Sequence, residues 1–342
     1  MYKPVFRITP YLLKLISEAS ELKSWVEGAT LQVAWLPGLQ KEARARRAHS
    51  STAIEGNPLS LAQVEAIADG KEVGAPRTYE KEVENYLKAM RWIERRKGSQ
   101  VEERDLLKLH TIVMDGPILK EKLGKYKDKQ NYVVNENNIK IYTPPSPQET
   151  PRLIKELIDW LNSQEADQLH GIIICAILHH RFVSVHPFPD GNGRVARALG
   201  SLILYQRDFD SRHIFSLDEY FAGNRRSYYE KIQQARELDD ELTPWIEYVA
   251  EGIISTLKNT KQRIEALQLS PSAKLYLSPR QEELVRLLRN APQLSGAEMI
   301  KKLKVSRARI NQLLMPLVKN GVVVKEGLSK ATRYRLSARK IT

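Results

Sequence analysis

Apolar residues recur at helical spacing through most of the first 270 residues. One example is the stripe formed by Tyr11, Leu12, Leu15, Ile16, Ala19 and Leu22, because residues three or four apart share a helix face. The same spacing predicts further helices over residues 39–55, 60–69, 78–97, 102–114, 149–163, 167–183, 192–206, 217–222, 224–236 and 242–268. So many helices in one stretch restrict it to a mainly α domain.

One segment departs from this helical pattern. Between Lys125 and Pro145, the β-prone runs 132–134 and 139–142 flank the turn-forming residues Asn135 to Asn138. This order predicts a β-hairpin inserted among the helices.

The length and the charge distribution both indicate a second domain. A chain of 342 residues is longer than one hydrophobic core usually organises, and Leu269 to Ser272 is the best candidate linker. We therefore expect domains at 1–270 and 271–342. The second contains eight Lys and eight Arg against four Glu, a net charge of +12 out of +13 for the whole chain. Such an excess favours a polyanion partner, most often nucleic acid, over the alternative of a solubilising surface.

The second domain resembles a winged helix-turn-helix. Helices are expected over 279–290, 296–303 and 306–320, followed by strands at 321–325 and 332–336. DNA contacts would then come from the third helix and the wing, through Arg307, Arg309, Asn311, Gln312, Lys330 and Arg333. Pro316 conflicts with this helix, which should kink or stop there. A winged helix used only for protein contacts is the alternative.

Membrane insertion and cysteine chemistry are not expected. The longest apolar run, Ile172 to Leu178, is much shorter than the roughly 20 residues of a membrane helix. The beginning of the chain lacks an apolar signal region, so we expect a cytoplasmic location. The single cysteine, Cys175, lies in that apolar run and is interpreted as a small buried hydrophobe.

The loop and helix start at residues 186–197 carry side chains suited to phosphate chemistry. Gly191 and Gly193 flank Asn192 at a predicted helix start, where free N–H groups favour an anion. Arg194 and Arg197 share one face of that helix and can reach the same polyphosphate.

Two further groups complete this set. Asp190 is an oxygen ligand suited to Mg²⁺. His186 titrates near neutrality and can take a proton from a hydroxyl. Together these residues indicate phosphoryl or nucleotidyl transfer.

The string HPFPDGNGRVAR at residues 186–197 resembles the Fic family motif, HxFx(D/E)GNGRxxR, at every fixed position. The resemblance implies an α-helical core that binds ATP with Mg²⁺ and transfers AMP to a Ser, Thr or Tyr hydroxyl of a target protein. The base would be His186, and the metal ligand Asp190. The phosphates would lie against Gly191, Asn192, Gly193, Arg194 and Arg197, while Phe188 would anchor the loop in the core.

Two looser features accompany the motif. The hairpin, with Gln130, Asn131, Tyr132 and Val133, resembles the family flap that pairs with the target backbone. Tyr228 and Tyr229 match a family Tyr-Tyr pair near the adenine, with ordinary helix packing as the alternative. Doc-like kinases of the superfamily carry a lysine-containing loop, whereas Gly193 keeps the adenylylating pattern.

Glu55 closes a predicted helix, at about 39–56, that ends at Gly56 and Asn57. A carboxylate at the negative end of a helix favours a nearby cation, and Ser51 lies on the same face. Ser51 to Gly56 resembles the Fic inhibitory motif, (S/T)xxxE(G/N), whose glutamate would pair with Arg197 and misplace the γ-phosphate.

The sequence leaves other functions open. The Fic-like domain of a DNA-binding regulator could sense nucleotide only, or the same site could remove AMP from a target with Glu55 as a catalytic group. Self-association into a homodimer is also left open.

Overall fold

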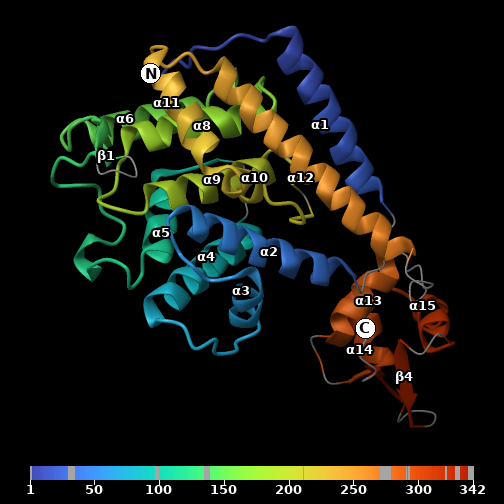
Figure 1. Cartoon of the computed structure of the whole chain (residues 1–342). Coiled ribbons are helices and arrows are strands. Elements are labelled where there is room, and N and C mark those ends of the chain that lie inside the picture. Colours follow the sequence, from blue (N-terminus) through green and yellow to red (C-terminus); the bar gives the residue numbers. More distant parts are fainter. Residues whose placement is uncertain are drawn as a thin grey trace. The chain divides into compact units, whose positions relative to one another are not determined.

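The chain divides into two compact units. The computed structural model describes residues 2–29, 35–96, 100–134, 139–210, 212–269, 279–289, 291, 293–319, 322–327 and 332–337 (Figure 1). One unit comprises Met1–Gly28 and Leu39–Gln262, and the other comprises Ala29–Gly38 and Arg263–Thr342. Most of the linker predicted at residues 269–272 lies outside the described residues.

The first unit is mainly α, as the periodicity predicts. Its helices before the hairpin are α1 (Pro10–Gly28), α2 (Trp35–Ile54, of which the residues from Leu39 belong to this unit), α3 (Leu61–Ala68), α4 (Arg77–Arg95), α5 (Glu103–Val113) and the short η1 (Lys120–Lys122). Those that follow are α6 (Thr150–Leu161), α7 (Gln164–Asp167), α8 (Gly171–Val185), α9 (Asn192–Gln206), α10 (Leu217–Gly223), α11 (Arg225–Glu237) and α12 (Thr243–Leu269, of which the residues up to Gln262 belong to this unit).

Helices α8 and α9 form the centre of this unit (Figure 1). Every residue of α8 except Arg181 is buried, which explains its continuous apolar run. Helix α9 packs against α4, α5 and α8, and α6 covers another part of α8. Cys175 is buried in α8 as predicted, and burial raises the pKa of its thiol to about 12. The segment that joins α8 to α9 is therefore held at both ends by well-packed helices.

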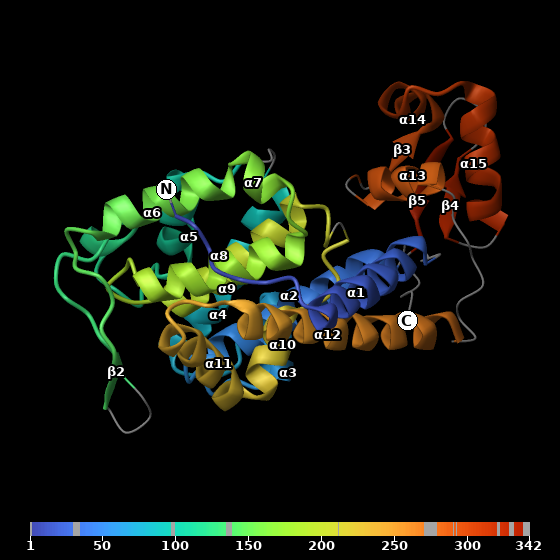
Figure 2. The same cartoon turned by 90° about the horizontal axis from the view of Figure 1, so that it is seen from above.

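The predicted hairpin is present. Strands β1 (Val133–Val134) and β2 (Lys140–Tyr142) pair antiparallel, with Val133 opposite Tyr142. Figure 2 shows β2 on an arm that projects from the helices. The predicted turn at residues 135–138 lies outside the described part of the chain. Large apolar side chains are exposed on both sides of this turn at Tyr132, Val134, Ile139 and Ile141.

The second unit has the predicted order of helices and strands. Helices α13 (Pro279–Arg289), α14 (Gly296–Leu303) and α15 (Arg307–Lys319) precede β4 (Val323–Glu326) and β5 (Arg333–Leu336). A further strand, β3 (Leu294–Ser295), completes a three-stranded sheet in the order β3-β5-β4. Strand β3 was not predicted from the sequence, because a strand of two residues is too short to show an alternation of apolar and polar side chains. An apolar core of its own includes Leu284, Met299, Leu313, Leu317 and Val323.

Helix α15 does not stop at Pro316, so the expectation that it ends there is wrong, while a kink at Pro316 stays a prediction. Ser306 caps the helix as predicted, because its Oγ accepts a hydrogen bond from the Arg309 amide at 3.2 Å. The helix continues to Lys319 with Pro316 in its interior. Leu313, Leu314 and Leu317 are buried in the core of the unit, and this packing offsets the backbone bond that the proline lacks.

Replacement of Pro316 by Ala should stabilise α15 by roughly 1–3 kcal/mol, because a helical amide donor is restored. Hydrogen exchange of the full chain should show slower exchange over residues 307–319. The exposed neighbour Met315 provides the control, since Met315→Ala changes no backbone bond. Equal exchange in Pro316→Ala and wild type would contradict the prediction.

Candidate functional site

The loop between α8 and α9 contains the predicted phosphate-binding residues. Helix α8 ends at Val185 and is capped by His186, whose φ of 50° is left-handed and turns the chain out of the helix. Gly191, with φ of 78°, begins the entry into α9, and a Cβ there would collide with the Met114 side chain. The sequence pattern thus corresponds to a helix-loop-helix in which glycine is required by both backbone angle and space.

Side chains beneath the loop fix its shape. Phe188 is fully buried and stacks on His110 with 3.8 Å between ring centroids. Asn192 bonds the loop main chain twice, since its Nδ2 donates to the Phe188 carbonyl at 2.8 Å and its Oδ1 accepts from the Phe188 amide at 2.9 Å. The Asn192 side chain is therefore engaged in holding the loop.

The base of the β1–β2 hairpin, the predicted flap, is attached to the same loop. Asn131 Nδ2 donates to the carbonyls of His186 and Phe188 at 3.3 and 3.0 Å. The Lys127 amide donates to the Pro187 carbonyl at 2.8 Å, and its Nζ donates to the Val185 carbonyl at 3.2 Å. Burial lowers the pKa of Lys127 to about 8. No sequence pattern singles out Lys127, because its role depends on where the fold places it.

The other predicted flap residues make contacts within the hairpin itself. Gln130 Nε2 donates to the Pro144 carbonyl at 2.9 Å and so closes the base of the hairpin. Tyr132 is exposed, with the Lys140 ammonium 4.9 Å from its ring centroid. Val133 belongs to β1.

His186 is held as a neutral imidazole. Its Nδ1 lies 3.2 Å from the Val183 carbonyl, which can only accept, so the proton of the neutral ring belongs on Nδ1. Burial lowers the pKa of His186 to about 4. At neutral pH, Nε2 is therefore the basic nitrogen of the ring.

Arg197 joins α9 to the end of α2. Its Nε donates to Ser51 Oγ at 2.8 Å, and its Nη2 donates to the Ser51 carbonyl at 2.9 Å and to Glu55 Oε1 at 2.7 Å. The Arg197 side chain is fully buried, whereas 28% of the Glu55 side chain is exposed. Burial alone would raise the pKa of Glu55, but the charges of Arg197 and Arg194 lower it more, and the net shift is downward. Glu55 is therefore an anion paired with a desolvated cation.

Gly193 makes room for this contact. A Cβ at Gly193 would lie 2.5 Å from Glu55 Oε1 and 3.1 Å from Arg197 Nη1. The glycine that the motif requires thus lies directly under the Glu55 carboxylate.

Arg194 has acidic neighbours on two sides. Its Nη1 lies 3.2 Å from Glu82 Oε1, and its Nη2 lies 3.7 Å from Asp190 Oδ1. Glu82, on α4, also accepts a hydrogen bond from Asn57 at 3.0 Å. Glu82 was not predicted, because an isolated glutamate on an amphipathic helix gives no sequence signal.

The two tyrosines occupy different environments. Tyr228 is buried, and its OH lies 2.8 Å from His179 Nε2 within an aromatic cluster. Tyr229 is 38% exposed, with the Arg225 guanidinium 5.5 Å from its ring centroid. Of the pair, only Tyr229 has a ring available for stacking on a ligand.

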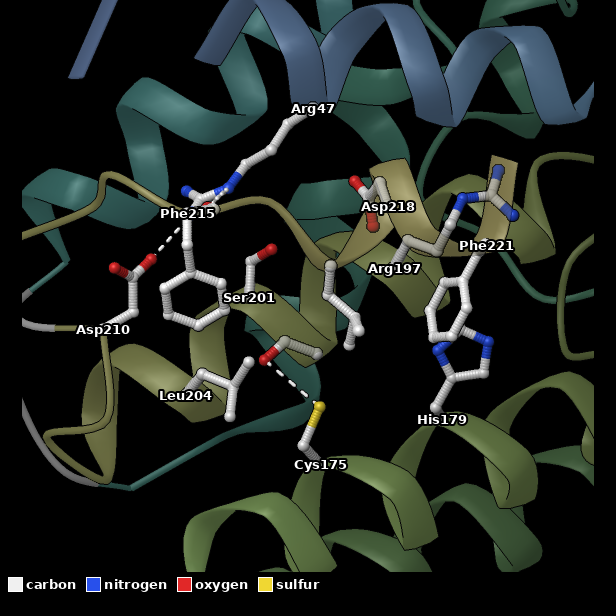
Figure 3. A pocket seen from close by; sticks show the side chains of 12 residues that line it. Arg47, Cys175, His179, Arg197, Ser201, Leu204, Asp210, Phe215, Asp218 and Phe221 are labelled. Carbon is white, nitrogen blue, oxygen red and sulfur yellow. Dashed lines mark hydrogen bonds and ion pairs between the residues drawn. The ribbon is translucent and has the colours of Figure 1, made fainter. Parts of the chain in front are cut away.

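A small buried pocket lies beside Arg197, away from Glu55. Arg47, Asp210 and Asp218 contribute charged side chains to its wall (Figure 3). Asp218 accepts a hydrogen bond from the Tyr86 hydroxyl at 2.9 Å. Arg47 thus places a charged side chain of α2 in the interior, in addition to the contact between Glu55 and Arg197.

The first unit thus combines a helical core with a glycine-containing loop that leads into α9. Residues 100–204 match the model of the Fic/DOC family. This segment of the chain is therefore similar to the domains of that family.

Curated relatives include the protein adenylyltransferase Fic of Nematostella vectensis, 31% identical over 215 residues, which are 61% of this chain and 47% of the relative. The protein of the same name from Aedes aegypti is 29% identical over 227 residues, 64% of this chain and 42% of the relative. The chain spans less than half the length of these relatives.

Solved structures show the same fold. A Fic family protein from Desulfovibrio desulfuricans G20 superposes with a TM-score of 0.70 and 24% identity, over 99% of each chain. Fic-1 from C. elegans (residues 134–508) gives a TM-score of 0.63 and 25% identity, over 75% of this chain and 73% of that one. The first likeness covers nearly the full chain, and the second covers three quarters of it.

Among the described residues, no helix is long and apolar enough to cross a membrane.

The His186 environment predicts an unusual titration. In NMR spectra of the full chain, the His186 ring should titrate with a midpoint near 4, compared with about 6.5 in denaturant. Because the folded pKa is lowered, the ring stays neutral until the pH falls through that midpoint. His186→Ala assigns the signal among the 7 histidines. A folded-state midpoint at or above 6.5 would refute the buried, neutral state.

Proposed function

We propose that this chain is a protein adenylyltransferase that transfers AMP from ATP to a Ser, Thr or Tyr hydroxyl of a target protein and is restrained by Glu55. The observation that carries the proposal is a pair of buried arginines with unpaired nitrogens at the start of α9, on the same loop as the neutral His186. The names of the curated relatives support the same activity.

The arginines fit a polyphosphate. Within the described structure, Arg194 Nε and Arg197 Nη1 are buried without a hydrogen-bond partner. A buried donor without a partner is costly, and an anion at this helix start would satisfy both. The fit therefore rests on donors that the fold itself leaves unsatisfied.

Asp190 suits Mg²⁺ that is bound together with the nucleotide. Its side chain is 61% exposed, and no cluster of three or more metal ligands occurs among the described residues. Mg²⁺ is commonly held by one or two carboxylates with waters and substrate phosphates. When bound there, the ion would neutralise phosphate charge.

The chemistry follows from the loop. His186 Nε2 accepts the proton of the target hydroxyl, whose oxygen attacks the α-phosphorus of ATP. The bond from that phosphorus to the bridging oxygen breaks, so AMP is transferred and pyrophosphate leaves. Arg194 and the α9 N-terminus stabilise the charge on the phosphates.

The flap supplies a docking strand for the target. Its exposed residues Tyr132, Val134, Ile139 and Ile141 and the short β1–β2 ladder suit an extended segment added as a further strand. Lys127 and Asn131 tie the flap to the His186 loop, so a hydroxyl carried on that strand is presented to the imidazole.

Replacement of Glu55 by Gly should raise self-adenylylation about tenfold or more, since a loss of about 1.4 kcal/mol in the restrained state already changes its population tenfold. Labelled ATP measures the rate. Glu72→Gly, at an exposed loop position, is the matched control and should equal wild type. Adding His186→Ala to Glu55→Gly should abolish labelling.

Two outcomes would overturn parts of this account. Unchanged labelling in Glu55→Gly would remove the restraint, and labelling that survives His186→Ala would remove the assigned base. If wild type removes AMP from the labelled chain and Glu55→Gly does not, Glu55 serves AMP removal.

A second function, DNA binding, is favoured by the exposed polar side chains at the start of α15, Arg307, Arg309, Asn311 and Gln312. Arg333 is less available because it pairs with Glu298 at 2.8 Å, and Lys330 lies outside the described residues. The net charge of this part of the chain supports a nucleic-acid partner.

Arg307→Ala and Arg309→Ala should each weaken DNA binding by roughly 1–3 kcal/mol. Fluorescence anisotropy with duplex DNA at several salt concentrations measures this loss. Arg286→Ala, an exposed arginine on α13, is the control. If wild type binds no DNA at low salt, the second unit has another partner.

A further inference from the structure

Helix α2 is attached to the core at a second place, two turns before Glu55. Arg47, Ser51 and Glu55 follow one another at four-residue intervals, so they share one face of the helix. Ser51 and Glu55 contact Arg197, as described above. Arg47 contacts the segment between α9 and α10 instead, which lies about 12 Å away along the helix axis.

The Arg47 contact is a buried ion pair with a main-chain bond. Its guanidinium donates to Asp210 Oδ2, and its Nε donates to the Phe215 carbonyl at 3.0 Å. Figure 3 shows Arg47 reaching from α2 to both groups, with Arg197 across the pocket. The Arg47 and Asp210 side chains are only 5% and 4% exposed. Burial raises the pKa of Asp210 to about 6 despite the opposing charge of Arg47, so this carboxylate depends on its partner.

Other ion pairs of α2 are less enclosed. In Lys41–Asp69 the side chains are 47% and 38% exposed, and in Arg44–Glu94 they are 20% and 19% exposed. Exposed pairs contribute little, whereas removing one partner of a buried pair is strongly destabilising. The Arg47 contact is therefore the one whose loss should most affect the position of α2.

We propose that Arg47 and Asp210 form a positioning pair that holds α2 in register, so that Glu55 reaches Arg197. The inference rests on the proposed restraint by Glu55 and assigns part of that restraint to residues outside the Ser51–Gly56 motif. Because Glu55 directly follows Ile54, the last residue of α2, and its amide donates to the Thr52 carbonyl at 3.0 Å, loosening α2 at Arg47 moves Glu55 relative to Arg197.

The pair also explains a feature of the pocket. The pocket lies between the two arginines, so α2 is fastened on both sides of it and bridges a small gap in the packing. A helix held at two points across a gap can be released from either one. A change in the α9–α10 segment could therefore act on Glu55 without contacting the nucleotide site.

The test measures self-adenylylation of full-length variants with labelled ATP. Arg47→Met should raise the rate of self-adenylylation about tenfold. This rise corresponds to a tenfold shift in the equilibrium from the restrained state to the active state. Asp210→Asn should change the rate in the same direction. The control Lys41→Met removes a charge from the same helix at an exposed pair and should equal wild type.

A merely structural role predicts the opposite sign, since a damaged fold loses activity. In a Glu55→Gly background, Arg47→Met should give no further rise, because the restraint is already absent. Hydrogen exchange over residues 46–54 should be faster in Arg47→Met than in Lys41→Met. If Arg47→Met is destabilised, the double variant Arg47→Met with Asp210→Leu removes both buried charges. This variant should remain folded and should label itself with AMP faster than wild type.

The outcomes are distinguishable. If Glu55→Gly raises labelling and neither Arg47→Met nor the double variant does, the positioning pair is refuted and the restraint stands. If Glu55→Gly itself does not raise labelling, the proposed restraint fails together with the inference. If Arg47→Met raises the labelling rate by the same factor in the wild-type protein and in the Glu55→Gly variant, Arg47 acts independently of Glu55. That result also overturns the inference.

Discussion

The arrangement of the first unit depends on one desolvated cation, the guanidinium of Arg197. It lies inside the helical core, where an unpaired charge would be very costly, and α2 provides both a hydroxyl and a carboxylate for it. This requirement fixes the end of α2 against the start of α9. The same guanidinium retains one unpaired nitrogen, so its electrostatic needs are only partly met from within the chain.

Much of the fold follows from the sequence. Apolar spacing located the longer helices to within a few residues, because most of them bury one face in the core of their unit, whereas the short α7 and η1 were not predicted. The hairpin at β1 and β2 was also predictable from short β-prone runs around a turn. Helix α15 shows the limit of local rules, since its buried leucines outweigh the interior proline.

The site was predictable where one short segment carries its residues. His186, Asp190, Arg194 and Arg197 are close in sequence, and they lie at the end of α8, in the following loop and in the first turns of α9. Glu82, Lys127 and Asp210 come from distant segments, and each has a partner that only the tertiary fold brings near. An isolated Glu, Lys or Asp has no periodicity to mark it, so no pattern could have selected these residues.

The absence of a side chain at Gly193 restricts which substitutions this loop can accept during evolution. Since even a methyl group there would overlap the Glu55 carboxylate, the identity of residue 193 and the presence of an acidic residue at the end of α2 are not independent choices. A descendant that acquires any side chain at this position must also give up this contact. Positions 193 and 55 should therefore change together, because the size of the side chain at 193 determines whether an acidic side chain at 55 can contact Arg197.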